Sequence, residues 1–200
     1  MTTINMLGKP CPLPVVEAKK ALAQPGTHGV IVQVDNIIAV QNLGKMAGRL
    51  GYGFSWKQRG EGVFAATIQA KNPNGQPITV PQPEPVIASE SLVFFITGDQ
   101  IGISDEKPGK ELMKSFLLSL AQSPVVPETI LLVNTGVKLA AEGSEVLDHL
   151  KTISKNGAKI LSCGQCLNYY GLTDKLAVGK ITNMLEIVEI LSSAQRTVTL

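Results

Sequence analysis

Apolar residues in this chain form two sets of strand-like and helix-like patterns, separated by a proline-rich stretch. The stretch, 71–89, reads KNPNGQPITVPQPEPVIAS and contains five prolines. Proline lacks a backbone donor and fixes φ, so neither a helix nor a central strand is expected there. We predict a semi-rigid, extended linker at 71–89, with one domain at 1–70 and a second at 90–200.

The pattern in the first half predicts the order strand, helix, strand, helix, strand, strand. Val15, Ala18 and Leu22 share one helix face, and Asn36 is a suitable N-cap for a second helix. The expected strands are 2–6, 30–34, 54–58 and 63–69, and the expected helices are 12–24 and 37–50. This order predicts a two-layer βαβαββ sandwich, with both helices on one face of the sheet.

In the second half, strands and helices alternate. The unbroken apolar run at 92–97 is typical of a parallel strand buried on both faces. Ser144 is a candidate N-cap, and Gly157 has the place of a C-cap glycine. The expected strands are 92–97, 130–133, 158–161 and 197–200, and the expected helices are 109–122, 144–156 and 183–193. We predict a three-layer, doubly wound, mostly parallel sheet, which makes the chain a two-domain α/β protein.

Composition narrows the possible functions. The 200 residues are 44 % hydrophobic and carry a formal net charge of +2, without the basic stripe of a nucleic-acid binder. The N-terminus lacks the pattern of a signal peptide, and no apolar stretch is long enough to cross a bilayer. We therefore expect a cytoplasmic protein that contacts neither membrane nor nucleic acid. Three cysteines in a reducing compartment argue against a disulfide framework.

Cys11 lies in the sequence Pro10-Cys11-Pro12-Leu13-Pro14, where a strand is expected to lead into a helix. Pro12 fits the first helical position, where its missing N–H costs nothing, so Cys11 is predicted to be the N-cap. There its sulfur would face unpaired backbone N–H groups and the positive end of the helix dipole, which favour the nucleophilic thiolate. Pro10, Pro12 and Pro14 would hold the thiol on a stiff loop. A buried cysteine beside helix-start prolines is the alternative interpretation.

Cys163 and Cys166 follow a predicted buried strand in the sequence ILSCGQCLNYYGL. A zinc site would need about four ligands, and no second CxxC or HxxxH pair is present. A redox dithiol and a persulfide or selenide carrier, with one cysteine as acceptor and the other resolving, both fit the spacing. Inert packing is the remaining possibility.

Polar residues follow the same predicted strand ends. They could orient a small anion or stabilise a thiolate, although Gly, Asp and Asn are also ordinary turn residues. The candidate supporting residues are Asp99, Asn134, Thr135, Gly136, Lys138 and Gly164.

The stretch LGKPCPLPVVEAKKAL resembles the TusA (SirA-like) sulfur-carrier family, whose mark is a CPxP box at the start of the first helix. The resemblance covers about 4–70 and includes the VDN turn before the second helix. It implies that Cys11 accepts a persulfide sulfur and passes it on. One departure is the segment Asn5-Met6-Leu7-Gly8, where the family often has an Asp before the Gly.

The second half resembles the DsrE-like domains of sulfur-relay proteins, through NTGVKLAAEGSEVLDHLK and ILSCGQCLNYYGLTDKLAVGKITNM. Together, the two halves resemble the YedF-like group, which is described as sulfurtransferase-like and connected with selenium metabolism. Many DsrE-type domains carry one reactive cysteine. The CGQC pair departs from that pattern and favours a resolving or redox step.

These resemblances imply a thiol-based sulfur (persulfide) or selenium carrier, in which Cys11 is the acceptor and Cys163 and Cys166 are possible relay sites. The implied partners are a cysteine desulfurase or another sulfur or selenium donor protein, a downstream acceptor protein, and further copies of the chain in a homo-oligomer. No cofactor and no metal are implied. A thiol-disulfide oxidoreductase using Cys163 and Cys166, and a non-catalytic regulatory module that binds a small ligand, are the alternatives.

Overall fold

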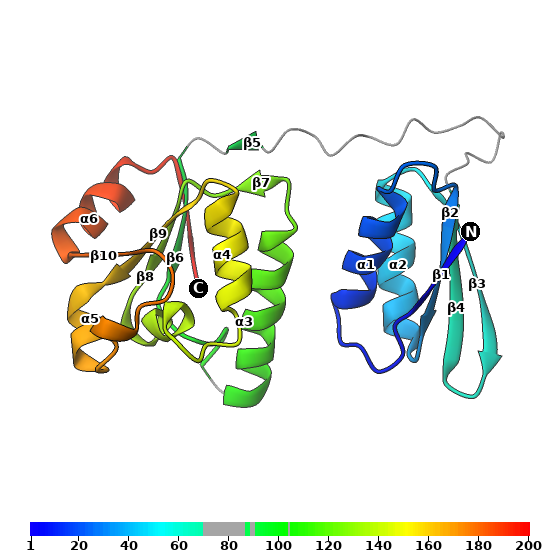
Figure 1. The fold of residues 1–200 in the computed structure, drawn as a ribbon, viewed down its shortest axis with the longest axis horizontal. Coiled ribbons are helices and arrows are strands. Elements are labelled where there is room, and N and C mark those ends of the chain that lie inside the picture. Colours follow the sequence, from blue (N-terminus) through cyan, green and yellow to red (C-terminus); the bar gives the residue numbers. More distant parts are fainter. Residues whose placement is uncertain (70–86, 89–90, 104) are drawn as a thin grey trace. The chain divides into compact units, whose positions relative to one another are not determined.

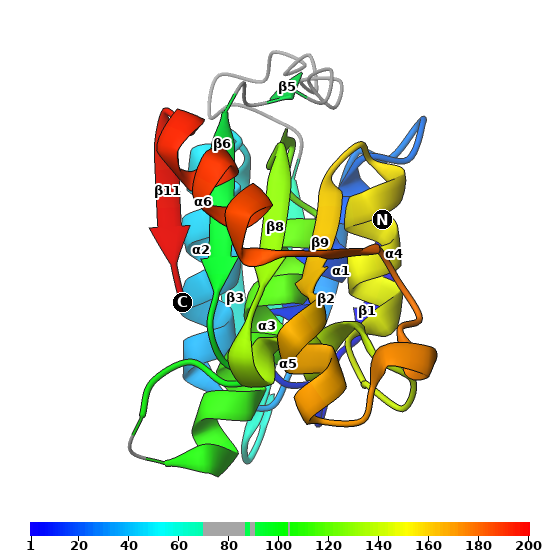
Figure 2. The ribbon, with the colours of Figure 1, turned by 90° about the vertical axis from the view of Figure 1, so that its left-hand side faces the viewer.

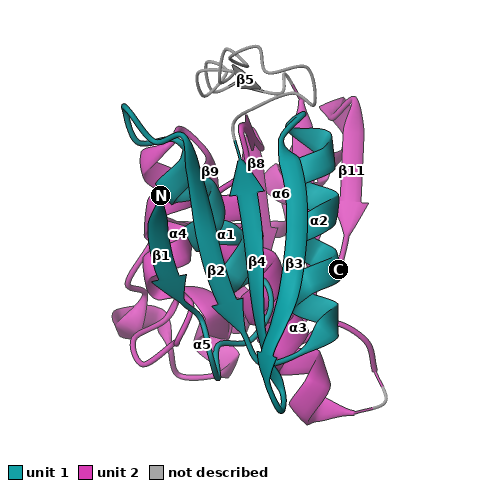
Figure 3. Cartoon of the chain, turned by 90° about the vertical axis from the view of Figure 1, so that its right-hand side faces the viewer, with its two compact units in different colours: residues 1–84 teal, residues 85–200 magenta. Residues whose placement is uncertain are grey.

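The structure, a computed structural model, describes residues 1–69, 87–88, 91–103 and 105–200. The chain divides into two compact units, residues 1–84 and 85–200 (Figure 3). Most of the predicted linker 71–89 lies outside the described residues. The linker, and the domain limits drawn on either side of it, therefore stay predictions.

Unit 1 is a two-layer α/β sandwich, which confirms the fold class predicted for this half. Its four-stranded sheet has the order β1-β2-β4-β3, in which only β1 and β2 are parallel. Both helices cover one face of the sheet (Figure 1). The elements are β1 (Thr2–Asn5), α1 (Leu13–Leu22), β2 (Gly29–Val34), α2 (Ile37–Arg49), β3 (Gly53–Gly60) and β4 (Val63–Gln69).

The core of unit 1 follows from the alternation of side chains along β2. Val30, Val32 and Val34 point to the helical layer and are fully buried, together with Leu43 of α2 and Ile68 of β4. Burying an aliphatic side chain of this size contributes about 1.5–3 kcal/mol. Asn36 caps α2 as predicted, because its side-chain oxygen accepts a hydrogen bond from the Ala39 N–H at 2.8 Å.

Unit 2 is a three-layer α/β unit with a five-stranded, wholly parallel sheet in the order β10-β9-β8-β6-β11. Helices α3 and α4 cover one face, and α5 and α6 cover the other (Figures 1 and 2). The sheet strands are β6 (Leu92–Ile96), β8 (Thr129–Leu132), β9 (Lys159–Cys163), β10 (Lys180–Thr182) and β11 (Arg196–Thr199). The helices are α3 (Glu106–Ala121), α4 (Leu147–Lys155), α5 (Gly164–Tyr169) and α6 (Met184–Ser193).

Several short elements of unit 2 have no counterpart in the sequence pattern. Strand β10 is one of them, and a small parallel pair formed by β5 (Ile87–Ala88) and β7 (Val125–Val126) is another. Two 3-10 helices, η1 (Asn134–Ala140) and η2 (Thr173–Lys175), complete the unit. These elements are too short for a hydrophobic period to show.

Two helix starts in unit 2 differ from the prediction. Helix α3 begins at Glu106 instead of residue 109, because Asp105 accepts a hydrogen bond from the Lys107 N–H and Pro108 is tolerated in the first turn. Helix α4 begins at Leu147 instead of residue 144. Ser144 accepts from the Val146 N–H and so belongs to the turn before the helix, for which it is not the N-cap.

The carboxyl ends of β6, β8 and β9 lie side by side in unit 2 and lead into the segments that carry the candidate residues. Strand β8 leads into η1, which packs against the end of β6 at Gly136. A Cβ atom on Gly136 would lie 2.6 Å from the Ile96 carbonyl oxygen. Glycine at this position therefore lets η1 approach the sheet closely.

Replacing Gly136 by alanine should destabilise unit 2 by about 1–3 kcal/mol, because η1 must move away from the Ile96 carbonyl. Urea unfolding followed by far-UV circular dichroism should show a lower midpoint for unit 2. Fluorescence of Trp56, the only tryptophan, reports unit 1 in the same sample and should not shift. The control is Gly98→Ala, where the nearest atom to the new Cβ lies at 3.4 Å. Equal midpoints for Gly136→Ala and wild type would show that the contact is unimportant.

Candidate functional site

Cys11 lies in the connection between β1 and α1 and is exposed. The prediction that it is the N-cap of α1 is wrong, because the helix begins at Leu13 with Pro12 as its N-cap. The Pro12 carbonyl accepts from the Val16 N–H at 3.1 Å, and the Pro10 carbonyl accepts from the Leu13 N–H at 3.0 Å. The carbonyl groups of these prolines therefore shape the first turn, and Cys11 comes one residue before the N-cap.

The sulfur of Cys11 contacts a side chain from the second helix. The Asn42 amide on α2 donates a hydrogen bond to the Cys11 Sγ at 3.5 Å. An amide donor at this position can orient the sulfur and stabilise negative charge on it. Sequence reasoning missed Asn42, because the contact joins residues 31 positions apart and no local pattern indicates it.

The loop before Cys11 is fastened to the start of α2. One Asp35 carboxylate oxygen accepts from the Gly8 N–H at 2.6 Å, and the other accepts from the Asn36 side chain at 2.8 Å. These two bonds, the Gly8 bond first, lower the pKa of Asp35, because they stabilise the carboxylate. Asn5 begins the segment that departs from the family pattern, and its side-chain oxygen accepts from the Leu7 N–H at 3.1 Å, which closes the turn at the end of β1.

In unit 2, the two cysteines differ in exposure. Cys163 is the last residue of β9 and the N-cap of α5, and its side chain is only 2 % exposed. Cys166 lies inside α5 and is partly exposed, and no disulfide joins it to Cys163. Helix α5 begins at Gly164, between the two cysteines. A Cβ on Gly164 would lie 2.8 Å from a methyl group of Ile181, so the β10 side of this turn has no space for a larger residue.

A short chain of contacts leads from Cys166 to Lys138. The Asn134 backbone N–H donates to the Cys166 sulfur at 3.1 Å, and the Asn134 side-chain oxygen accepts from the Tyr170 hydroxyl at 2.9 Å. The Lys138 ammonium lies 4.9 Å from the centre of the Tyr170 ring, as in a cation–π contact. Asn134 has a positive φ of 49°, a backbone conformation that asparagine tolerates better than most residues.

The structure places each sequence-predicted residue of unit 2 at this edge of the sheet. Thr135 accepts a hydrogen bond from the Asp99 N–H at 3.2 Å, which ties the end of β6 to η1. Tyr170 was not predicted, although the pair Tyr169-Tyr170, which begins three residues after Cys166, indicates that aromatic side chains lie near the thiols.

The pKa of the Cys166 thiol is raised, chiefly by burial. The Asn134 N–H acts in the opposite direction, while a hydrogen bond with Cys163 and the charge of that residue raise the pKa further. Cys166 is therefore a protonated thiol at neutral pH and becomes nucleophilic only when it is deprotonated.

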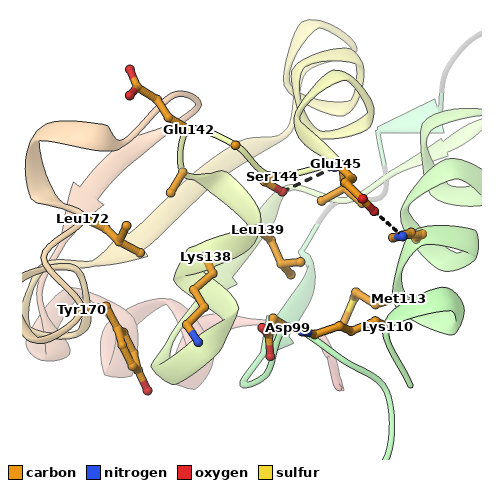
Figure 4. A pocket seen from close by; sticks show the side chains of 14 residues that line it. Asp99, Lys110, Met113, Lys138, Leu139, Glu142, Ser144, Glu145, Tyr170 and Leu172 are labelled. Atoms are coloured by element: carbon orange, nitrogen blue, oxygen red, sulfur yellow. Dashed lines mark hydrogen bonds and ion pairs between the residues drawn. The ribbon is translucent and has the colours of Figure 1, made fainter. Parts of the chain in front are cut away.

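A pocket of about 410 Å³ lies beside these residues (Figure 4). Asp99, Lys138 and Tyr170 line it together with α3 and the turn before α4. Cys163 and Cys166 do not line it, and the pocket shares only Tyr170 and Lys138 with the contact chain described above.

Both units match families of known proteins. Residues 2–70 match the family of the sulfurtransferase TusA. A SirA-like protein from Desulfitobacterium hafniense is 50 % identical over 35 % of this chain and 97 % of its own, with a TM-score of 0.34. The chain belongs to the TusA family. Residues 127–200 also match the DsrE/DsrF-like family, so this TusA-family protein carries a DsrE-like part as well.

Two further solved structures match about half of the chain at low identity. The ychN protein from E. coli is 12 % identical over 55 % of this chain and 99 % of its own, with a TM-score of 0.44. A protein of unknown function from Methanobacterium thermoautotrophicum is 18 % identical over 55 % of this chain and 97 % of its own, with a TM-score of 0.41. No curated protein matches the chain. TusA and DsrE proteins act in sulfur relay, in which they receive sulfur from one partner protein and pass it to another.

Two further features of the described residues bear on other functions. No helix there is long and apolar enough to cross a membrane. In the same residues, no group of three or more His, Cys, Asp or Glu side chains is placed to hold a metal ion.

Because the pKa of Cys166 is raised, alkylation of this thiol by iodoacetamide should accelerate with an apparent pKa above about 8.5, the ordinary value for cysteine. Cys163→Ala removes one cause of the shift and should move the midpoint to lower pH. Peptide mass spectrometry at a series of pH values reads the rate at Cys166, with glutathione as the reference thiol. A midpoint below that of an ordinary cysteine would contradict the burial effect.

Proposed function

We propose that the protein is a thiol-based carrier of sulfur or selenium and that Cys11 is its acceptor. Family membership supports sulfur-relay chemistry, and the exposure of Cys11 beside the Asn42 amide supports its role. The Cys11 sulfur attacks the terminal sulfur of a donor persulfide, R–S–SH. A new S–S bond forms, the donor S–S bond breaks, and the donor leaves as R–SH, which gives Cys11–S–SH.

Cys166 is the second acceptor in this proposal. Its partial exposure lets it approach the Cys11 persulfide, in the same chain or in another copy. The Cys166 thiol loses its proton as its sulfur attacks the terminal sulfur, the Cys11 S–S bond breaks, and the leaving Cys11 sulfur takes up a proton to restore the thiol. Cys163 is buried beside it and is hydrogen-bonded to it, as a resolving thiol would be. Attack of Cys163 on the inner sulfur of Cys166–S–SH forms the Cys163–Cys166 disulfide and releases hydrogen sulfide.

The proposed donor is a cysteine desulfurase or another sulfur or selenium donor protein in the cytoplasm, and a downstream protein is the acceptor. We also propose that the chain forms a homo-oligomer. Support for this comes from exposed apolar side chains on β10 and α6, namely Ile181, Met184, Leu185 and Val188. Exposed apolar side chains that gather on neighbouring elements are typical of a surface that another protein covers.

The acceptor role is tested by incubating the protein with a cysteine desulfurase and cysteine, followed by intact mass spectrometry. Wild type should gain the mass of one or more sulfur atoms, and Cys11→Ser should gain none. Cys163→Ser is the matched control, because it should still carry sulfur at Cys11. Equal sulfur on wild type and Cys11→Ser would rule out Cys11 as the first acceptor.

The Asn42 contact gives a finer test. Asn42→Ala removes the amide donor from the Cys11 sulfur and should slow sulfur acceptance by about two- to tenfold, the effect of one ordinary hydrogen bond. The control is Gln41→Ala, because Gln41 is the exposed neighbour on α2. The initial rate of sulfur uptake measures the effect. If both variants accept sulfur at the wild-type rate, Asn42 does not position the thiol.

A thiol-disulfide oxidoreductase is the second candidate, and the hydrogen bond between Cys163 and Cys166 favours it. The two candidate functions differ in whether they need Cys11. An oxidoreductase would cycle between dithiol and disulfide at full rate in Cys11→Ser, whereas the carrier depends on Cys11.

A further inference from the structure

Some of the charged side chains that line the pocket in unit 2 have no ion-pair partner among the described residues. Three lysines and three acidic residues line it, namely Lys110, Lys114, Lys138, Asp99, Glu142 and Glu145. Lys114 is paired with Glu111 at 2.9 Å and with Glu145. Lys110 is paired with Glu106 at 2.6 Å. Two of the three cations are therefore already neutralised by acidic partners.

Three charged lining residues, Glu142, Lys138 and Asp99, take part in none of these ion pairs, and Lys138 and Asp99 lie on the same side of the pocket (Figure 4). In the described part of the chain, neither has an ion-pair partner within 4 Å; Lys138 instead lies over the Tyr170 ring. Figure 4 shows Lys138, Asp99 and Tyr170 along the same side of the pocket, with Lys110 next to Asp99. Glu142 and Glu145 come from the turn before α4, on the opposite side (Figure 4).

Apolar side chains form the pocket wall between these charged groups. Met113 of α3, Leu139 of η1 and Leu172 line the pocket. Its volume of about 410 Å³ is in the range of small-molecule sites, about 300–1,000 Å³, which combine apolar walls with a few placed polar groups. A ligand with an aliphatic middle and charged ends would match this distribution.

We propose that this pocket binds a small zwitterionic molecule of the amino-acid or short-peptide type, with its carboxylate at Lys138 and its ammonium group at Asp99. A simple anion would be attracted by Lys138 but repelled by Asp99. A simple cation would be attracted by Asp99 but repelled by Lys138. A zwitterion satisfies both groups, and charge-assisted hydrogen bonds of this kind are about twice as strong as neutral ones.

The pocket is connected to the Cys166 thiol through hydrogen bonds, and this connection favours one kind of ligand. Tyr170 lines the pocket and also donates to Asn134, which in turn donates to the Cys166 sulfur. A low-molecular-weight thiol that carries an amino-acid group belongs to the proposed ligand class and would be held beside Tyr170, which two hydrogen bonds through Asn134 connect to Cys166. The binding itself does not depend on the sulfur-carrier role proposed above.

Isothermal titration calorimetry on the full chain tests the ligand class. The zwitterionic probes are S-methylcysteine and S-methylglutathione, thioethers that cannot exchange with protein thiols. Propionate and propylammonium are the single-charge probes. We expect at least one zwitterion to bind about tenfold more tightly than either single-charge probe, which corresponds to one additional charge-assisted contact.

Two near-isosteric variants test the site. Lys138→Met and Asp99→Asn should each weaken zwitterion binding by about tenfold. Lys151→Met and Asp148→Asn, on exposed positions of α4 away from the pocket, should leave it unchanged. Circular dichroism of each variant checks that unit 2 is folded.

Three results would overturn the proposal: no binding of either zwitterion, propionate binding as tightly as S-methylcysteine, or wild-type affinity in both pocket variants. Failure of sulfur transfer to Cys11 would be a separate result, because the probes contain no transferable sulfur and the pocket does not include Cys11.

Discussion

The hydrogen bond from the Asn134 backbone N–H to the Cys166 sulfur holds the site in unit 2 together. It joins the segment after β8 to the helix after β9, and it is possible only because parallel strands end at the same edge of the sheet. Gly136 lets η1 approach that edge closely. The bond opposes the effect of burial on the thiol but does not cancel it, so Cys166 combines partial access with a raised pKa.

Unit 1 also positions a cysteine thiol, but with a different set of contacts. Its cysteine is exposed before the helix, and the Pro10 and Pro12 carbonyls occupy N–H groups of the first turn. The Asp35 carboxylate fixes the preceding loop, and the Asn42 amide reaches the sulfur from the second helix. An exposed thiol on a fixed loop suits exchange with a partner protein, whereas the partly buried Cys166 beside Cys163 suits a second step shielded from solvent.

Hydrophobic patterning was sufficient to predict the fold class and most of the elements. The alternation along β2 and the unbroken apolar run of β6 each dictate one way of packing a sheet. Helix starts were less reliable, because Pro108 in α3 and Ser144 before α4 can each occupy more than one position of a first turn. The same ambiguity put Cys11 at the N-cap, where the structure has Pro12.

The candidate residues near strand ends were found from the sequence, because the topology of a parallel sheet collects them. Asn42 and Tyr170 were not found, since their contacts depend on how two helices pack or how a side chain turns, and neither leaves a periodic signal. The ion pairs of the pocket also depend on tertiary contacts, such as that between Lys114 and Glu145. The spacing of these residues in the sequence does not indicate that they meet.

The most direct test of the central claim is a time course of persulfide location after addition of a cysteine desulfurase and cysteine, read by peptide mass spectrometry. Persulfide should be found on Cys11 first and on Cys166 later, and Cys11→Ser should leave Cys166 unmodified. If Cys166 acquires sulfur at the same rate with and without Cys11, Cys11 is not the entry point for sulfur.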